Sequence, residues 1–321
     1  MAGKPKIFVL NKLPEAVEAR FKRDYDVRLN PDDKTYSAAE IIAGARGVDG
    51  VVTSPTTPVR ADVINALEKT VRIIATFSVG FDHVELDAAK ARGIAVTNTP
   101  EVLTDATADM AMLLLLAGAR RTYEGQKILR NGQWIGWRPT QLIGIGCQGK
   151  RLGIYGMGRI GQAVARRAKP FGFELHYHDQ APLPADRTEG ATFHARIEDM
   201  LPICDYLTLH CPLTPETRKF LNAKRIAMLP KGAVVVNTAR GPVIDDDALI
   251  AALQSGHVAA AGLDVFDGEP KINPGYIGLD NAYLLPHLGS ATLDTRNAMG
   301  FRVLDNLDAF FKDGKPRDRL V

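Results

Sequence analysis

The chain has 321 residues, of which 45% are hydrophobic and 24% are charged, a length and composition that suit about two globular domains. Forty basic and 37 acidic residues nearly balance, so charge gives no support for a nucleic-acid partner. The three cysteines favour a reducing compartment over a disulfide framework. The longest apolar run, Met110–Ala119, is about half of what a membrane span requires, and we therefore expect a cytoplasmic protein without a membrane partner.

The first part of the chain alternates between strand-like and helix-like segments. Short runs rich in β-branched and aromatic residues predict strands, and the amphipathic stretches between them predict helices. The predicted strands cover residues 6–10, 48–54, 71–78 and 94–99, and the predicted helices cover residues 37–47, 61–70 and 83–93. This alternation predicts a parallel sheet with helices on both faces.

The rest of the chain continues with a helix and a second series of strands. One long helix is predicted over residues 105–132, and an irregular segment rich in Trp, Gly and Pro follows at 133–146. The second β-α-β series runs through residues 151–156, 159–172, 173–179, 204–212, 233–239, 246–256, 259–266 and 282–287, and a last helix lies within residues 288–314. Two α/β units are therefore expected.

The segment GMGRIG, residues 156–161, has the G-x-G-x-x-G pattern of dinucleotide-binding turns, and it lies between a predicted strand and a predicted helix. Gly156 would permit the tight turn, Gly158 would let the backbone approach a pyrophosphate, and Gly161 would let the helix pack close to the strand. The helix N-terminus would offer N–H donors to phosphate. The alternative is a glycine-rich turn of an ordinary α/β protein.

An acidic residue at the end of the next strand bears on the choice of coenzyme. Asp179 lies roughly 20 residues beyond the glycines, where a carboxylate binds the ribose hydroxyls and repels a 2′-phosphate. No arginine follows it before Arg187. We therefore expect NAD(H) to be preferred, with NADP(H) left open, and a surface aspartate without this role is the alternative.

The position of the glycine motif determines the expected domain organisation. The residues before it must form a unit of their own, and the last helix, with no later neighbour, would pack on that first unit. We expect an α/β fold with two Rossmann-like or flavodoxin-like parallel sheets, in which the nucleotide-binding domain is inserted into the substrate domain. The substrate domain would comprise residues 1–99 and 289–321, and the NAD-binding domain residues 100–288.

Three residues at the ends of predicted strands in the second unit suit hydride transfer to a 2-keto acid. Such a reaction needs a cation for the carboxylate and carbonyl, and a proton donor at the carbonyl oxygen. Arg240 offers a planar fork for a carboxylate, and a carboxylate such as Glu269 beside His287 would stabilise the protonated imidazole. Taken singly, each could equally be a solvated arginine, a turn glutamate or a structural histidine.

Several longer motifs resemble one enzyme family along essentially the whole chain. They include SVGFDHVELDAAKARGIAVTNTPEVLTDATADMAMLLLLAGARR, GIYGMGRIGQAVARRAKPFG, LHCPLTPETR, VVVNTARGPVID, AGLDVFDGEP and LLPHLGSAT. With these motifs the chain resembles the D-isomer-specific 2-hydroxyacid dehydrogenases. FSVGFDH, GWRP and DGEPKINPGY make it most similar to the branch of glyoxylate/hydroxypyruvate reductases and glycerate dehydrogenases.

The resemblance implies a role for each matching residue. Arg240 would bind the substrate carboxylate and carbonyl oxygen, and His287 would be the general acid in reduction, oriented by Glu269. The backbone N–H groups of Val79 and Gly80 would hold the carboxylate of a small 2-keto acid, so the first unit would form half of the substrate cleft. The family's contacts also place Arg159 and Ile160 at the pyrophosphate, Cys211, Pro212 and Thr217 on the adenosine side, and Thr238, Ala239, Asp264, His287 and Gly289 around the nicotinamide.

The long helix and the segment after it, at about residues 100–147, resemble the family's dimerisation element, so a homodimer is expected. In the most similar branch a tryptophan at the position of Trp137 reaches the partner's active site; burial in the arm of its own dimer is the alternative.

Other functions remain open at this stage. Formate dehydrogenases carry glutamine at the position of Glu269, and long phosphoglycerate dehydrogenases carry a further regulatory domain, so both fit less well. D-lactate and short phosphoglycerate dehydrogenases stay possible. A different class is an NAD-sensing binding protein such as the C-terminal-binding-protein corepressors, which share the fold and the catalytic residues but carry extra terminal segments for partners.

Overall fold

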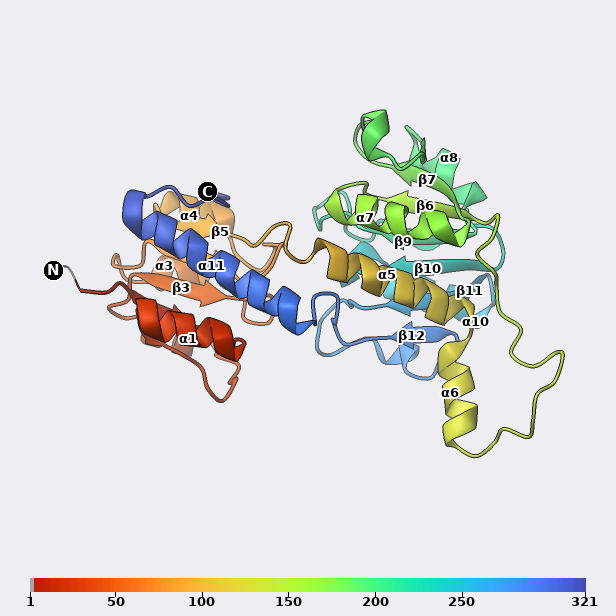
Figure 1. Cartoon of the computed structure of the whole chain (residues 1–321), viewed down its shortest axis with the longest axis horizontal. Helices are drawn as coiled ribbons and strands as arrows, with labels where there is room; N and C mark the ends of the chain where they lie inside the picture. Colours follow the sequence, from red (N-terminus) through yellow and green to blue (C-terminus); the bar gives the residue numbers. More distant parts are fainter. Residues whose placement is uncertain (1–2) are drawn as a thin grey trace. The chain divides into compact units, whose positions relative to one another are not determined.

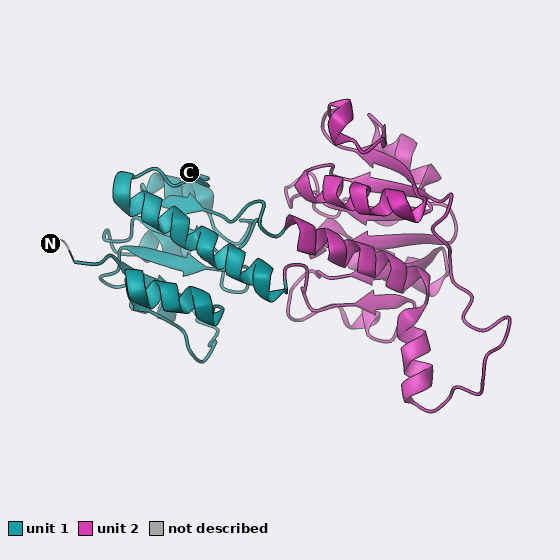
Figure 2. Ribbon diagram, viewed as in Figure 1, with its two compact units in different colours: residues 1–103, 291–321 teal, residues 104–290 magenta. Residues whose placement is uncertain are grey.

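The computed structural model describes residues 3–321. The chain forms two compact units, shown in Figure 2. Unit 1 comprises residues up to Leu103 together with Ala291–Val321, and unit 2 is the continuous stretch Thr104–Ser290. The prediction of an α/β protein with two parallel sheets is confirmed, because every strand pairing within each sheet is parallel.

Unit 1 is built on a five-stranded sheet with the order β2-β1-β3-β4-β5. Its strands are β1 (Lys6–Val9), β2 (Asp26–Arg28), β3 (Gly50–Thr53), β4 (Ile73–Thr76) and β5 (Ala95–Thr97). Its helices are α1 (Glu15–Asp24), α2 (Ala38–Gly44), α3 (Ala61–Ala66), α4 (Leu86–Ala91) and α11 (Leu293–Asp313). Unit 1 therefore contains both the earliest and the latest parts of the chain (Figure 1).

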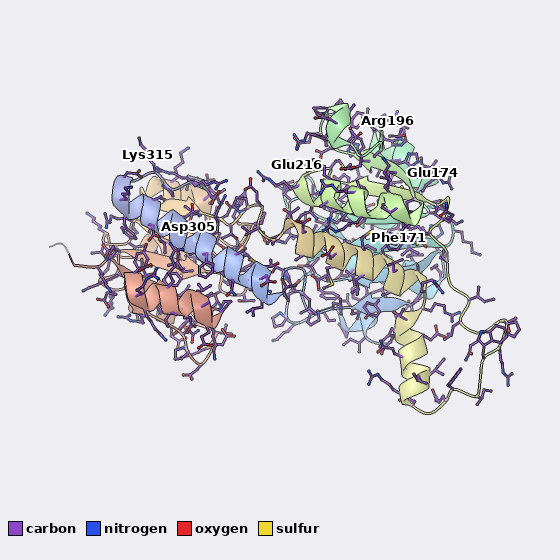
Figure 3. All side chains as sticks on the ribbon, viewed as in Figure 1. Phe171, Glu174, Arg196, Glu216, Asp305 and Lys315 are labelled. Carbon is purple, nitrogen blue, oxygen red and sulfur yellow. The ribbon has the colours of Figure 1, made fainter. Side chains whose placement is uncertain are left out.

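Helices cover both faces of this sheet. One core contains side chains from α2, α3 and α4, and the other contains side chains from α1 and α11. On the second face, Arg20 of α1 bonds Asp305 of α11 at 2.9 Å, and Asp305 is labelled in Figure 3. Gly300 of α11 allows this approach, because a β-carbon there would lie 2.4 Å from a methyl group of Val17. The last helix is thus an integral part of the first unit.

The residues after α11 return along the edge of the sheet. Residues 314–321, called the edge segment here, lie beside β5, where Thr97 and Arg319 form an antiparallel bridge. The Leu320 N–H donates to the carbonyl of Val96 at 2.7 Å. The edge segment therefore covers backbone groups of β5 that an open sheet edge would leave unpaired.

Unit 2 is built on a seven-stranded sheet with the order β12-β11-β10-β9-β6-β7-β8. Its strands are β6 (Arg151–Tyr155), β7 (Glu174–His178), β8 (Thr192–Phe193), β9 (Tyr206–Leu209), β10 (Ala233–Asn237), β11 (Val258–Leu263) and β12 (Ala282–Leu284). Its α-helices are α5 (Thr104–Ala119), α6 (Thr122–Arg130), α7 (Arg159–Ala168), α8 (Ile197–Met200), α9 (Ala223–Ile226) and α10 (Asp246–Gln254). Strand order reverses at β6, which is where open α/β sheets bind ligands.

The two faces of the second sheet are also covered. Side chains of α5 and α7 fill one core, and those of α8, α9 and α10 fill the other. Arg167 of α7 bonds Asp109 and Asp105 of α5 at 2.5 and 2.9 Å, which fastens the first turn of α5 to α7. These contacts hold the last turn of α7 against α5.

The prediction of one long helix over residues 105–132 is wrong. The chain breaks between α5 and α6, where Arg121 adopts a left-handed conformation with φ 52°. Three local hydrogen bonds lie at the break: Thr122 Oγ1 donates to the Ala117 carbonyl at 3.1 Å, and Arg121 donates to Glu124 through two nitrogens. Neither residue between the two helices, Arg120 or Arg121, is a glycine or a proline, which is why the pattern did not reveal the break.

Several short elements have no counterpart among the predicted segments. They are α1, β2, β8, α8 and α9. Most hold only a few residues, too short for a hydrophobic period to be recognised. No helix within residues 3–321 combines the length and the apolar character needed to cross a membrane.

Candidate active site

The glycine turn between β6 and α7 has the geometry that the motif predicts. Gly156 has φ +94°, and a β-carbon there would lie 2.8 Å from the backbone nitrogen of Cys211. A β-carbon at Gly161 would lie 2.2 Å from the carbonyl oxygen of Gly156, so the helix packs tightly on the turn. Gly158, in contrast, has open space around it. This open space fits the role predicted for Gly158, which is to let a ligand approach the backbone.

The start of α7 offers donors to an anion. Gly158 precedes the helix, and no side chain caps its N-terminus. The N–H groups of Arg159 and Ile160 lie in the first turn, where an α-helix has no internal acceptors. Uncapped N–H groups and the positive end of the helix dipole form a site for phosphate.

Asp179 lies directly after β7 and is held beside the glycine turn. One carboxylate oxygen accepts the N–H of Met157 at 2.7 Å, and the other accepts the N–H of Gln180 at 2.7 Å. The next arginine, Arg187, donates to the side chain of Gln162 on α7 at 3.3 Å. The structure therefore fixes a carboxylate at the end of β7 and directs the first following arginine to α7.

The loop after β9 holds the residues expected on the adenosine side. Cys211 is buried against the glycine turn, and burial raises the pKa of its thiol to about 12. Thr217 Oγ1 donates to the carbonyl of Pro212 at 2.6 Å and accepts the N–H of Thr214 at 2.8 Å. Cys211, Pro212 and Thr217 thus belong to one compact loop next to Gly156.

Arg240 follows β10 in a turn that a buried asparagine closes. The side chain of Asn237, which is fully buried, accepts the N–H of Ala239 and donates to the carbonyl of Arg240, both at 2.9 Å. The Arg240 side chain also donates to the Ala239 carbonyl at 2.8 Å. Gly241 allows this turn to pack directly against the backbone at Phe266, because a β-carbon at residue 241 would lie 1.8 Å from the Phe266 carbonyl carbon.

Glu269 and His287 form a hydrogen-bonded pair. His287 Nδ1 lies 2.8 Å from Glu269 Oε2, and the other carboxylate oxygen accepts the N–H of Phe266 at 2.8 Å. Burial alone would raise the pKa of Glu269, but the bond and charge of His287, the Phe266 N–H and the charge of Arg240 together hold that pKa below its usual value. Glu269 is therefore an anion near neutral pH, bonded to one nitrogen of the imidazole.

The backbone at His287 is fixed from both sides by Asp264. His287 has φ 56°, a strained conformation for a residue with a side chain. Its N–H donates to the carbonyl of Asp264 at 2.9 Å, while the Asp264 carboxylate accepts the N–H groups of Leu288 and Gly289 at 2.6 and 2.7 Å. Burial raises the pKa of Asp264 against the effect of these donors. Asp264 is a structural support for the turn that carries the histidine.

Thr238 contacts a neutral histidine at the end of β9. His210 Nε2 lies 2.9 Å from Thr208 Oγ1, and Nδ1 lies 3.4 Å from Thr238 Oγ1. Burial lowers the pKa of His210 to about 3. A neutral imidazole therefore connects the ends of β9 and β10, next to the glycine turn.

In unit 1, the turn at residues 78–80, called the carboxylate loop here, follows β4. Its three carbonyl groups are all bonded, by the Thr99 N–H at 2.9 Å, the Asn98 side chain at 2.8 Å and the Ser78 hydroxyl at 2.6 Å. Among residues 3–321, none accepts a hydrogen bond from the N–H of Val79 or Gly80. Two adjacent unpaired donors are a feature of anion-binding loops.

Trp137 does not lie with these groups. The arm, residues 131–150, extends from α6 without regular structure (Figure 1). The Trp137 side chain in this arm is 80% exposed. The structure thus brings Arg240, Glu269, His287, Asp264 and Gly289 together in unit 2 and leaves Trp137 outside that cluster.

Asn237 and Asn98 are supports that sequence reasoning missed. Each is a buried polar residue at the end of a hydrophobic strand, followed by a threonine. A buried asparagine must find hydrogen-bond partners, so an asparagine ending an apolar run was the available signal.

The NAD-binding domain of the D-isomer specific 2-hydroxyacid dehydrogenases matches residues 112–289. The glycerate dehydrogenase of Hyphomicrobium methylovorum is 45% identical over 96% of this chain and 97% of its own, and the glyoxylate reductase of Thermococcus litoralis is 41% identical over 98% and 96%. The structure is similar to that of an NADPH-dependent glyoxylate/hydroxypyruvate reductase from Sinorhizobium meliloti in complex with NADP and malonate, with a TM-score of 0.88, 36% identity and coverage of 99% and 97%. The chain belongs to the D-isomer specific 2-hydroxyacid dehydrogenase family, in the branch of glyoxylate/hydroxypyruvate reductases and glycerate dehydrogenases.

Proposed function

We propose that this enzyme reduces glyoxylate and hydroxypyruvate to glycolate and D-glycerate, reversibly and with NADH in preference to NADPH. The observation that carries the proposal is the Glu269–His287 pair at 2.8 Å, next to the positive charge of Arg240. This arrangement combines a proton donor, a carboxylate that orients it and a cation for the substrate. A 2-keto acid presents a carboxylate and a carbonyl group, which require that set.

The glycine turn suits a nicotinamide dinucleotide. Gly158 leaves open space beside an uncapped helix N-terminus, which fits a pyrophosphate held by the N–H groups of Arg159 and Ile160. We assign Cys211, Pro212 and Thr217 to the adenosine side, and Thr238, Ala239, Asp264, His287 and Gly289 to the surroundings of the nicotinamide. The bound coenzyme supplies the hydride.

The preference for NADH rests on Asp179. Its carboxylate is held in place by two N–H donors, so it is available at a fixed position for the ribose hydroxyls. A 2′-phosphate would meet a like charge there, with Arg187 bonded to Gln162. The Sinorhizobium meliloti reductase binds NADP, so this preference needs a direct measurement.

The protein's own groups carry the proton and hold the substrate. We assign the substrate carboxylate to the N–H groups of Val79 and Gly80 and to Arg240, which also polarises the carbonyl. His287 gives its proton to the carbonyl oxygen during reduction and takes it back during oxidation. Glu269 keeps Nδ1 of His287 bonded, so that Nε2 carries the transferred proton.

We further propose a homodimer in the cytoplasm. Large apolar side chains are exposed on α5, α6 and the arm: Leu113, Tyr123, Leu129, Trp134, Ile135, Trp137 and Ile143. A group of exposed apolar residues of this kind is typical of a protein–protein interface. In such a dimer Trp137 would reach the partner's active site. The three cysteines are free thiols, in agreement with a reducing compartment.

The test follows NADH oxidation at 340 nm with hydroxypyruvate, glyoxylate, pyruvate and phenylpyruvate, each repeated with NADPH. Turnover of the first two substrates with NADH is expected. Activity restricted to pyruvate or phenylpyruvate would place the enzyme with another substrate group of the family, and preference for NADPH would contradict the role of Asp179. No turnover with any substrate would favour an NAD-sensing binding protein.

A further inference from the structure

A buried polar network leads from α11 to the carboxylate loop within unit 1. Arg302 of α11 donates to both carboxylate oxygens of Asp318, at 2.5 and 2.9 Å. Asn306 donates to Asp318 at 3.0 Å and to the carbonyl of Asn98 at 3.1 Å, and its own oxygen accepts the Asp318 N–H at 3.0 Å. The side chain of Asn98 then donates to the carbonyl of Val79 at 2.8 Å.

The network is shielded from water along most of its length. The Arg302 and Asp318 side chains are 12% and 6% exposed, and Asn306 is 1% exposed. In such surroundings each hydrogen bond is strong, and a polar group without a partner lowers the free energy of unfolding. Asn98 is also held through its backbone, because its N–H donates to the Asp318 carbonyl at 3.3 Å. Its side chain is therefore confined to one orientation.

Planar peptide units transmit this constraint to the donors of the loop. The carbonyl of Val79 and the N–H of Gly80 belong to one rigid unit and point in opposite directions. Fixing that carbonyl by Asn98 therefore fixes the direction of the Gly80 N–H. In the same way, the bond from the Thr99 N–H to the Ser78 carbonyl, at 2.9 Å, fixes the direction of the Val79 N–H.

We propose that Asn306 and Asp318 are positioning residues for the substrate carboxylate, because they hold Asn98 and through it the carboxylate loop. The proposal rests on the proposed function, since it takes Val79 and Gly80 as the donors to that carboxylate. Residues from the edge segment and from α11 thus determine how well a turn early in the chain binds the keto acid. Pre-orienting donors lowers the entropy that a ligand must lose on binding.

The test compares Asn306→Leu and Asp318→Asn with a matched control, Asp49→Asn. Asp49 also pairs with an arginine, Arg72, and accepts a backbone N–H, from Lys6, but it precedes β3 at the opposite end of the same sheet. Amide hydrogen exchange of Asn98 and Thr99, whose N–H groups donate to Asp318 and to Ser78 of the loop, is measured in the full-length proteins and is called the loop exchange. The same proteins are assayed for kcat and for the KM values for hydroxypyruvate and NADH. Asp318→Asn preserves the shape of the side chain, and it provides the test if the Asn306→Leu variant does not fold.

We expect Asn306→Leu to speed the loop exchange and to raise the KM for hydroxypyruvate about tenfold, with kcat and the KM for NADH within about twofold of wild type. Asp318→Asn should act in the same direction and less strongly, and Asp49→Asn should change neither quantity. Unchanged loop exchange, or a KM for NADH that rises in parallel, would overturn the positioning role. Lack of turnover in the wild type would instead reject the proposed function, and the exchange rates would then decide this proposal alone.

Discussion

Two turns in this chain offer backbone N–H groups to an anion at the carboxyl end of an interior strand, and they are built differently. The glycine turn after β6 uses three glycines and the N-terminus of α7, all within a few consecutive residues. The carboxylate loop after β4 does not lead directly into a helix. It is fixed by Asn98 and Thr99, and Asn98 is held in turn by Asn306 and Asp318. A local motif suffices for the first turn, whereas the second depends on the completed unit.

The largest expected effect comes from a variant that removes the proton donor and leaves both turns intact. His287→Asn should lower kcat/KM about 10³-fold, because the proton donor is lost. Binding of NADH, measured by fluorescence titration, should weaken far less than kcat/KM falls, since no glycine-turn donor is altered. A variant that keeps more than about a tenth of the wild-type kcat/KM would show that another group donates the proton.

The glycine turn can be disturbed without touching the rest of unit 2. Gly158→Val adds a side chain into open space, so the fold should tolerate it, but the pyrophosphate could no longer approach the backbone. We expect the KM for NADH to rise at least about tenfold and the KM for hydroxypyruvate to stay nearly constant.

Gly278→Val is the control for Gly158→Val, because a β-carbon at that exposed glycine also meets no neighbour. Equal effects of the two substitutions on the KM for NADH would contradict a coenzyme role of the turn.

We propose that Asp179 selects between NADH and NADPH, and we expect its replacement to have a moderate effect. Asp179→Asn keeps an oxygen for the Met157 N–H and removes the negative charge. The ratio of kcat/KM for NADH to that for NADPH should fall about tenfold, which corresponds to about 1.4 kcal/mol. A ratio that does not change would mean that the carboxylate acts only as a support for the turn.

The smallest expected effect is a change in the pH dependence of stability, which arises from His210 next to the glycine turn. Burial lowers the pKa of His210 to about 3, so below about pH 6.5 the unfolded chain binds a proton that the folded chain does not. The contribution of His210 to the free energy of unfolding is complete above about pH 6.5. It is lost as the pH falls toward the pKa of His210 in the folded chain, with a slope of at most about 1.4 kcal/mol per pH unit.

The matching experiment measures urea unfolding at pH 7, 6 and 5 for wild type and His210→Gln. The variant should lose less stability on acidification, and hydrogen exchange in β6 and β9 should report the difference locally. Identical slopes for the two proteins would mean that His210 does not titrate as its burial requires.

The difference between the two turns also explains what could be read from the sequence. The parallel α/β units and the roles of Gly156 and Gly161 follow from local pattern, since strand period and turn glycines are encoded in neighbouring residues. Val79 and Gly80 could be named only through a family resemblance, because nothing local sets them apart. Asn306 and Asp318 went unrecognised because the residue that they hold, Asn98, lies far away in the sequence; the separation from Asn306 is 208 residues. The break at Arg121 was missed because no glycine or proline lies at the break, although Arg121 has φ 52°.

The position of α11 in unit 1 has a consequence for synthesis of the chain. One face of the first sheet, formed by residues such as Ile7, Val9 and Ile73, is covered by Val303 and Leu304 of α11. On the ribosome that face emerges early and waits for its cover while all of unit 2 is made, at about 5–20 residues per second. Unit 2, being continuous, can fold during this interval. Newly made chains therefore pass through a stage with a finished second unit and a first sheet of which one face is covered by α1 but not yet by α11, the stage at which chaperones have most to protect.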